Sequence, residues 1–290
     1  MSNLSEVDLN ALDRIIEEIE QKELEEQAAE NKNDSTNNPP ERLSEDQFKL
    51  DVDESTIRFS SATWFDKIQE FDVTLGGCGG IGSYVAYLLA RLKPFRVTLY
   101  DDDTVERVNM AGQMFSSEDI GRPKVTAIAK KMVAYSNFYS YVTIDGRITP
   151  DMPITNVVLC GFDNMVARKD TFDNWLQKVR TLALEEQKEE FERSIFIDGR
   201  LAAENYQVIA IRASDDDRIK EYRDKYLFND DQAESEICSF KQTAFMANQI
   251  ASTMINVLVN HAANLVYGVE ARSVPFFTSY SASTMLFKTE

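Results

Sequence analysis

The sequence predicts an α/β fold: a mainly parallel sheet with helices on both faces and an antiparallel extension toward the C-terminus. From Phe71 onward, short apolar segments typical of strands alternate with longer segments of helical periodicity, the order that builds parallel sheets. A glycine-rich loop joins the first strand to the first helix. Toward the C-terminus, segments 195–197 and 207–212 both read as strands, and we expect them to be antiparallel neighbours.

The first three elements form a βαβ unit: a short buried strand at 71–75, a helix at 83–91 and a second strand at 96–100 that leads to Asp101. The later elements are expected, in order, at 124–135 (helix), 141–144 and 156–160 (strands), 172–193 (a long charged helix), 195–197 and 207–212 (strands), 243–266 (helix) and 275–287 (one or two short strands). Residues 215–236 are polar and acidic, lack periodicity and are too long for an ordinary connection.

The loop Gly77-Cys78-Gly79-Gly80-Ile81-Gly82 carries a G-x-G-x-x-G pattern between that first strand and helix. Glycines at these positions let the chain turn tightly and approach a phosphate, and the helix N-terminus offers N–H groups to the anion. Asp101 follows about 20 residues later, where an acid can accept hydrogen bonds from a ribose. The unit therefore predicts a Rossmann-like nucleotide site, with a merely structural tight turn as the alternative.

Composition and charge argue against several other classes of protein. The 290-residue chain has a formal net charge of −18, of which residues 1–56 contribute −12 (17 acidic and 5 basic residues), so the remainder is only mildly acidic. An acidic body argues against sequence-independent binding of nucleic acid. No apolar run approaches the length of a membrane span and no signal peptide opens the chain, so we expect no membrane partner.

Cysteine and histidine are sparse. Three cysteines (Cys78, Cys160 and Cys238) and one histidine are too few and too scattered for a zinc cluster, so we expect no zinc. An odd, low cysteine count without an export signal fits a reducing compartment, and we expect a cytoplasmic protein. Cys160 is expected to pack as a small hydrophobic residue at a strand end.

The chain divides into three parts by composition. Residues 1–30 predict an acidic amphipathic helix or tail, with a narrow apolar stripe formed by Leu12, Ile15, Ile16 and Ile19. Residues 31–55 predict a polar linker, and residues 56–290 the nucleotide-binding domain. The helix is either a docking element for a partner or neighbouring subunit, or a marginal solvated helix on a tail.

Further spacings follow the glycine loop in a fixed order. They are Asp101-Asp102-Asp103-Thr104-Val105, then Asn109 and Gln113, then Gly121-Arg122-Pro123-Lys124, then Asp163-Asn164 with Arg168 behind them, and finally Cys238 before the last helix. Over about residues 56–268, this ordered set (GxGGxG, DxDxV, NxxxQ, GxxK and a D-N pair after a strand) resembles the ThiF/MoeB/HesA family, the adenylating fold shared with ubiquitin-activating enzymes.

The resemblance implies ATP-dependent adenylation of a carboxylate, usually the C-terminus of a small ubiquitin-like or sulfur-carrier protein, with release of pyrophosphate. It implies a homodimer, ATP and Mg²⁺. It assigns the ribose to Asp101, the cation on the phosphates to Lys124 and magnesium to Asp163. The remaining nucleotide-binding positions that it implies are Gly77, Gly79, Gly80, Gly82, Asp103, Asn109 and Gln113.

Two of these assignments can also be examined from the residues alone, without the family resemblance. Lys124 begins a helix, where the helix dipole disfavours a cation, so its placement indicates an anion nearby. Asp163 and Asn164 are both good N-cap residues, so an alternative is that they cap the following helix.

The sequence also departs from the family pattern. Gly112 occupies the place of the arginine in the usual N-x-x-R-Q, and a serine, Ser61, occupies that of a second arginine; Arg58, Arg107 or Arg122 are candidates to compensate. The zinc-binding C-x-x-C pairs are absent. Cys238 lies where some members carry a catalytic cysteine, but Glu234 and Glu236 would raise the pKa of its thiol, so an ordinary cysteine is the alternative.

Three functions therefore compete. The first is a ThiF-like adenylyltransferase. The second is a nucleotide-binding or catalytically impaired scaffold that acts through protein–protein interaction, which the loss of both arginines favours. The third, a dinucleotide-dependent oxidoreductase, shares the glycine loop and Asp101 but has no use for Lys124 and Asp163 at strand ends.

Overall fold

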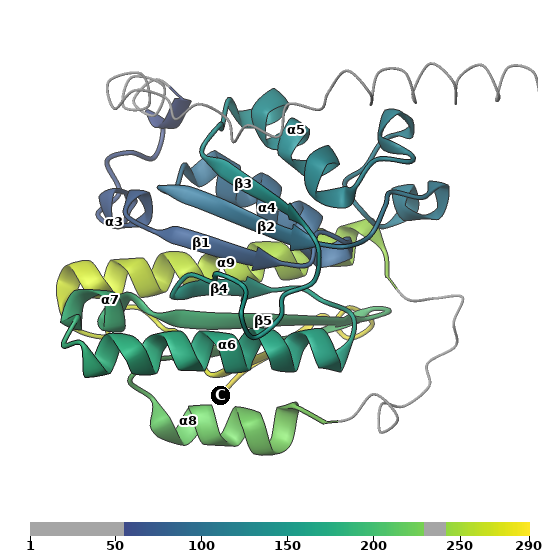
Figure 1. The fold of residues 1–290 in the computed structure, drawn as a ribbon. Coiled ribbons are helices and arrows are strands. Elements are labelled where there is room, and N and C mark those ends of the chain that lie inside the picture. Colours follow the sequence, from purple (N-terminus) through teal and green to yellow (C-terminus); the bar gives the residue numbers. More distant parts are fainter. Residues whose placement is uncertain (1–54, 229–241) are drawn as a thin grey trace, which may run out of the picture. The chain divides into compact units, whose positions relative to one another are not determined.

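The computed structural model describes residues 55–228 and 242–290 (Figure 1). Within them, eight strands form one sheet in the order β3-β2-β1-β4-β5-β6-β7-β8. The parallel part consists of β1 (Asp72–Gly76), β2 (Arg96–Asp101), β3 (Tyr141–Asp145), β4 (Val157–Cys160) and β5 (Ile195–Ala202). The antiparallel part adds β6 (Asn205–Arg212), β7 (Phe277–Ser281) and β8 (Leu286–Thr289). The predicted fold class is confirmed.

The strand order reverses at the centre of the sheet. From β1 the chain runs outward through β2 and β3, and then it returns to place β4 on the other side of β1 and continues to β5. The loops that follow β1 and β4 therefore leave the sheet toward opposite faces; in open α/β sheets, ligands bind at the carboxyl ends of the strands at such a reversal. The glycine loop lies at this point.

Helices cover both faces of the sheet (Figure 1). One face carries α4 (Gly80–Leu92), α5 (Lys124–Ser136) and α9 (Ala244–Tyr267), with α4 packed between the other two. The opposite face carries α6 (Met165–Leu184) and α8 (Asp216–Glu221). Shorter elements are α3 (Phe65–Gln69), α7 (Lys188–Arg193), the 3₁₀ turns η1 (Arg107–Ala111) and η2 (Ser117–Asp119), and the π-helical turn η3 (Tyr222–Tyr226).

Each face has its own hydrophobic core, because alternate residues of a strand point to opposite sides. In β4, Val157 and Leu159 pack with α4 and α9, whereas Val158 and Cys160 pack on the other face. The second core is aromatic and includes Phe172, Trp175, Phe196 and Tyr222. The expected packing of Cys160 as a small hydrophobic residue is confirmed, since its side chain is fully buried there.

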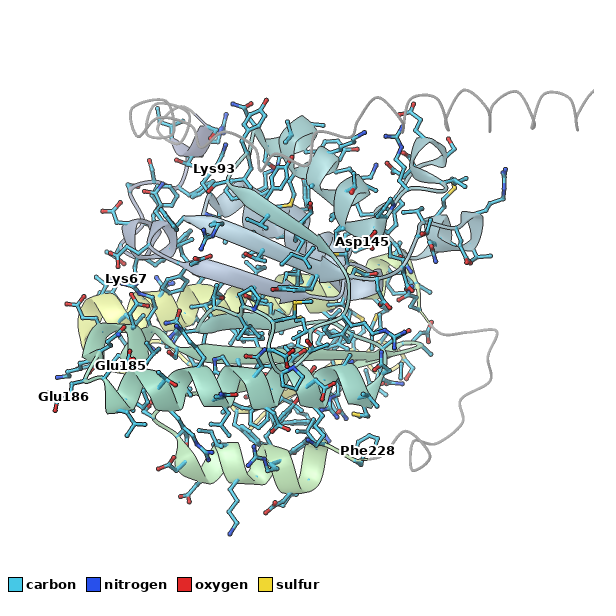
Figure 2. All side chains as sticks on the ribbon, in the orientation of Figure 1. Lys67, Lys93, Asp145, Glu185, Glu186 and Phe228 are labelled. Carbon is cyan, nitrogen blue, oxygen red and sulfur yellow. The ribbon has the colours of Figure 1, made fainter. Side chains whose placement is uncertain are left out.

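The expectation of one long helix at 172–193 was wrong. The helix α6 begins at Met165, because the Asn164 side chain accepts a hydrogen bond from the Ala167 N–H at 2.8 Å and caps it. It ends at Leu184, and Glu186 then takes a left-handed conformation (φ 54°) before α7 begins. Figure 2 labels Glu185 and Glu186 at this turn.

The first part of the stretch 215–236 contains regular structure that its polarity did not predict. It forms α8 and η3, which are held to the sheet because Ile219 and Tyr222 are buried. These two buried residues are spaced i and i+3, and one such pair is too short a pattern to be recognised as helical periodicity. The structure describes the chain as far as Phe228, labelled in Figure 2.

Several predictions lie outside the described residues: the N-terminal helix at 1–30, most of the linker at 31–55, and Cys238. Within residues 55–228 and 242–290, no helix is both long and apolar enough to cross a membrane.

Candidate functional site

The glycine loop turns from β1 into α4 in a conformation that side chains would block. Gly77 has φ 85°, a left-handed conformation that favours glycine. A Cβ atom on Gly82 would lie 1.7 Å from the Gly77 carbonyl oxygen, so this turn of helix can approach the loop only without a side chain. The Gly161 N–H donates to the Gly76 carbonyl at 2.8 Å, which ties the loop after β4 to the loop after β1.

Asp101, at the end of β2, holds this loop in place. Its Oδ2 atom accepts a hydrogen bond from the Cys78 N–H at 2.6 Å, and its Oδ1 atom accepts one from the Asp103 N–H at 2.9 Å. Burial raises the pKa of the Asp101 carboxyl above its ordinary value, while these two N–H groups and the nearby Lys124 act in the opposite direction. The acid predicted to anchor a ribose therefore also fixes the loop that would meet the phosphates.

Lys124 lies beside the same loop, paired with an acid. Its side chain is 8% exposed, and its Nζ atom lies 2.7 Å from Oδ2 of Asp103, whose side chain is 65% exposed. The Lys124 N–H also donates to the Asp103 carbonyl at 2.9 Å. The structure thus places a buried cation at the N-terminus of α5. The sequence predicted an anion near Lys124, and in the structure this anion is Asp103.

Two more predicted residues come from the turn η1 and its end. The Asn109 Oδ1 atom accepts the Glu106 N–H at 2.7 Å, so this side chain caps η1. The Gln113 amide lies above Gly79, where a Cβ atom would be 3.9 Å from it, and its Oε1 atom is buried without a hydrogen-bond partner in the described structure. Gln113 therefore lies at the loop with unused bonding capacity, whereas Asn109 is occupied locally.

Asp163, directly after β4, was predicted to hold magnesium, with capping of the following helix by Asp163 and Asn164 as the alternative. Asn164 is the N-cap of α6. Asp163 is exposed, and within the described part of the chain its side chain accepts a hydrogen bond only from the Asn164 amide, at 3.4 Å. Its carboxylate is therefore available to a cation. Among the described residues, no group of three or more histidine, cysteine or acidic side chains could by itself hold a metal ion.

A buried charge network lies behind the end of β4, and sequence reasoning missed it. The Arg168 guanidinium donates to Asp198 and to the Phe162 carbonyl, and to the Gly199 carbonyl at 3.0 Å. Asp198 is fully buried and also accepts from Arg200 and from the Tyr222 hydroxyl, at 2.7 and 2.9 Å. An acid within the apolar strand IFID was the available signal, because a carboxylate is buried only when it is paired.

Both cysteines in the described residues are buried. Burial is the largest cause that raises the pKa of the Cys78 thiol, and Asp101 raises it further. Burial raises the pKa of Cys160 to about 12. Neither thiol provides a thiolate near neutral pH.

These features define a doubly wound α/β protein with a glycine-rich loop at the reversal of strand order. The chain belongs to the ThiF family, which matches residues 54–289. The family resemblance predicted from the ordered motifs is confirmed.

Curated relatives match over shorter stretches. The ubiquitin-like modifier-activating enzyme 5 of Arabidopsis thaliana is 33% identical over 103 residues, which cover 33% of this chain and 24% of that protein. The protein of the same name from Aedes aegypti is 30% identical over 130 residues, 44% of this chain and 28% of the relative. The chain thus spans about a quarter of the length of these relatives.

Solved structures show the same fold at low identity. MccB of E. coli, in a crystal structure with ATP, has a TM-score of 0.59 and 16% identity, and the alignment covers 83% of this chain and 70% of MccB. PaaA has a TM-score of 0.58 and 15% identity, with 99% of this chain and 87% of PaaA covered.

Proposed function

We propose that this protein uses ATP to adenylate a carboxylate, the C-terminus of a small ubiquitin-like or sulfur-carrier protein, and releases pyrophosphate. The observation that carries the proposal is one hydrogen-bonded chain at the strand-order reversal. It runs from the glycine loop through Asp101 to Asp103 and Lys124. In open α/β sheets, ligands bind at this point.

In the proposed reaction, a carboxylate oxygen attacks the α-phosphorus of ATP, and the bond to the bridging oxygen of pyrophosphate breaks. Negative charge grows on the phosphate oxygens, and fixed donors that face them lower the barrier. Lys124 and the N–H groups at the start of α4 supply such donors. Asp101 would hold the ribose, and Gln113 would lie near the loop with its unused oxygen.

Asp163 would hold Mg²⁺, which, when bound, neutralises charge on the phosphates. An exposed carboxylate that is not used as the helix cap fits this task, because Mg²⁺ is usually held by one or two carboxylates together with substrate phosphates and water. Cys238 remains a candidate to take up the activated carboxyl.

The names of relatives agree with this class of reaction. The curated relatives are ubiquitin-like modifier-activating enzymes. MccB has been solved with ATP and with MccA. The proposal also includes a homodimer, a cytoplasmic location and a nucleotide-binding domain at 56–290 that follows the acidic helix (1–30) and the linker (31–55).

One observation favours a second candidate, a nucleotide-binding scaffold without adenylation. Gly112 provides no side chain at the end of η1, and a phosphate-binding arginine contributes strongly to rate in other phosphoryl-transfer enzymes. A scaffold of this kind would bind ATP and recruit a partner without turnover.

Titration calorimetry with ATP·Mg²⁺ tests the proposal first, with Lys124→Ala and Asp163→Ala as variants and NAD⁺ as the alternative ligand. We expect saturable ATP binding that both variants weaken. Exchange of labelled pyrophosphate into ATP, in the presence of small proteins that end in Gly-Gly, then separates an adenylyltransferase from a scaffold. No ATP binding at concentrations up to about a few millimolar contradicts both.

A further inference from the structure

The side chain of Gln242, just before α9, lies over the glycine loop. A Cβ atom on Gly80 would lie 1.9 Å from Oε1 of Gln242 and 3.0 Å from its Nε2 atom. A Cβ atom on Gly112 would lie 2.9 Å from its Cγ atom and 3.1 Å from Nε2. Gln242 therefore occupies a space that exists only because both positions are glycine, one at the start of α4 and one at the end of η1.

The glycine at position 112 is not required by its backbone. Its φ and ψ angles are −126° and −9°, which residues with side chains also adopt. The contact that a side chain there would disturb is the one with Gln242. Gly112 and Gln242 thus form a matched pair, although 129 positions separate them in the sequence.

The amide of Gln242 has bonding capacity to spare. No hydrogen bond between described residues uses this amide, and the side chain is only partly buried. Two neighbouring groups are in the same condition: the Gln113 Oε1 atom, beside Gly79, and the Thr243 Oγ1 atom are buried without a partner in the described structure. Unpaired buried polar atoms are rare in folded proteins, and the Gln113 oxygen lies at the same glycine loop as the Gln242 amide, which indicates a ligand there.

We propose that the Gln242 amide binds the phosphate chain of a nucleoside triphosphate at the glycine loop, in the room that Gly112 leaves. The inference rests on the proposed function and adds a residue to it. A glutamine amide carries two N–H donors, and a phosphate oxygen accepts them. Because Gly80 has no side chain, both the phosphate and the Gln242 amide would then be able to lie close to the glycine loop.

Calorimetric titration of ATP·Mg²⁺ into the full chain tests this inference, with a melting temperature recorded for each variant. Gln242→Ala should weaken ATP binding about tenfold, the loss of a hydrogen bond to a charged group. Gln242→Glu, which keeps the shape and adds a negative charge, should weaken it more. Adenosine, which lacks phosphates, should bind the wild type and Gln242→Ala equally.

The matched glycine supplies a second arm. Gly112→Ala should displace Gln242 and weaken ATP binding, but it should add nothing when Gln242→Ala is already present. Gly146→Ala is the control, because a Cβ atom there meets nothing within 4 Å.

Equal or tighter ATP binding by Gln242→Ala overturns the inference and leaves the proposed function intact; tighter binding would mean that the amide covers the site. Additive effects of the two substitutions overturn the pairing with Gly112. Failure of the wild type to bind ATP overturns the proposed function together with this inference.

Discussion

Lys124 and Asp103 form an ion pair in which the cation is buried and the anion is exposed. The side chains are 8% and 65% exposed, and 2.7 Å separates Nζ from Oδ2. The exposed carboxylate can turn toward water, whereas the lysine cannot follow it. We therefore expect a phosphate at the glycine loop to replace Asp103 as the partner of Lys124 without exposing the lysine.

We expect Lys124→Ala to weaken ATP·Mg²⁺ binding by at least about tenfold, because a charge-assisted contact to phosphate is lost. Calorimetry measures this directly. Lys131→Ala is the control: Lys131 lies on the same helix and pairs with Asp119 at 2.6 Å. If the two variants bind ATP equally well, Lys124 does not contact the nucleotide.

Asp163 and Asn164 should separate a metal effect from a folding effect. Asn164→Ala removes the cap of α6 and should lower the free energy of unfolding by about 1 kcal/mol, with little change in ATP affinity. Asp163→Ala should leave stability nearly unchanged and reduce the Mg²⁺ dependence of ATP binding. Urea denaturation and calorimetry at two Mg²⁺ concentrations distinguish these outcomes. The reverse pattern would assign the metal role elsewhere.

The pair Arg168 and Asp198 should dominate local stability. Arg168→Leu leaves a buried carboxylate with fewer donors, and breaking a buried pair costs about 3–5 kcal/mol. Arg147→Leu breaks an ion pair with Asp102 whose side chains are 78% and 40% exposed, and it should change stability little. Comparable effects in the two variants, measured by urea denaturation, would contradict the importance of the buried network.

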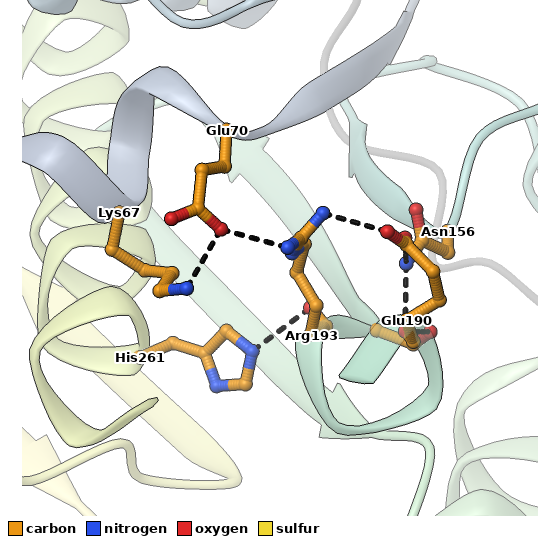
Figure 3. A network of polar contacts seen from close by, with 7 residues as sticks. Lys67, Glu70, Asn156, Glu190, Arg193 and His261 are labelled. Atoms are coloured by element: carbon orange, nitrogen blue, oxygen red, sulfur yellow. Dashed lines mark hydrogen bonds and ion pairs between the residues drawn. The ribbon is translucent and has the colours of Figure 1, made fainter. Parts of the chain in front are cut away.

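His261 should make the protein sensitive to mild acid. Burial lowers its pKa to about 4, and its Nε2–H donates to the Arg193 carbonyl at 3.0 Å (Figure 3). The unfolded chain takes up this proton near pH 6.5 and the folded chain only near pH 4, so acidification favours unfolding across that window. It is the single histidine of the sequence.

Between pH 7 and pH 5, the histidine should account for a loss of about 2 kcal/mol in the free energy of unfolding. His261→Gln keeps a donor for the carbonyl and should remove this part of the pH dependence. The neighbouring Glu70 and Glu190 both pair with Arg193, each at 2.7 Å (Figure 3). An unchanged pH profile in the variant would show that His261 is not the group responsible.

Much of the fold follows from local patterns, because strands buried on both faces and helices with one apolar face have distinct periods. Strand β2 and helix α5 begin where the sequence predicts, at Arg96 and Lys124. The start of α6 and its end were predicted wrongly, because they depend on features other than hydrophobic periodicity. A side-chain cap at Asn164 starts α6 early, and a single left-handed residue, Glu186, divides α6 from α7.

The positions of Asp101 and Asp163 were predictable, because Asp101 ends the parallel strand β2 and Asp163 follows the parallel strand β4. Gln242 was not, because it reaches the glycine loop through tertiary packing and belongs to no motif. Asp198 was missed for a similar reason: its partners Arg168 and Tyr222 come from α6 and η3, and they meet Asp198 only through tertiary packing.

Cys78, enclosed within the glycine loop, makes that loop observable in solution. Its thiol is fully buried and its N–H is held by Asp101, so an alkylating reagent reaches it only when the loop opens. The rate of its modification under native conditions therefore measures how often the loop opens, at a thiol the chain already carries. A ligand that binds the closed loop slows this rate in proportion to its occupancy, and the dose dependence gives an affinity that needs no label on the ligand.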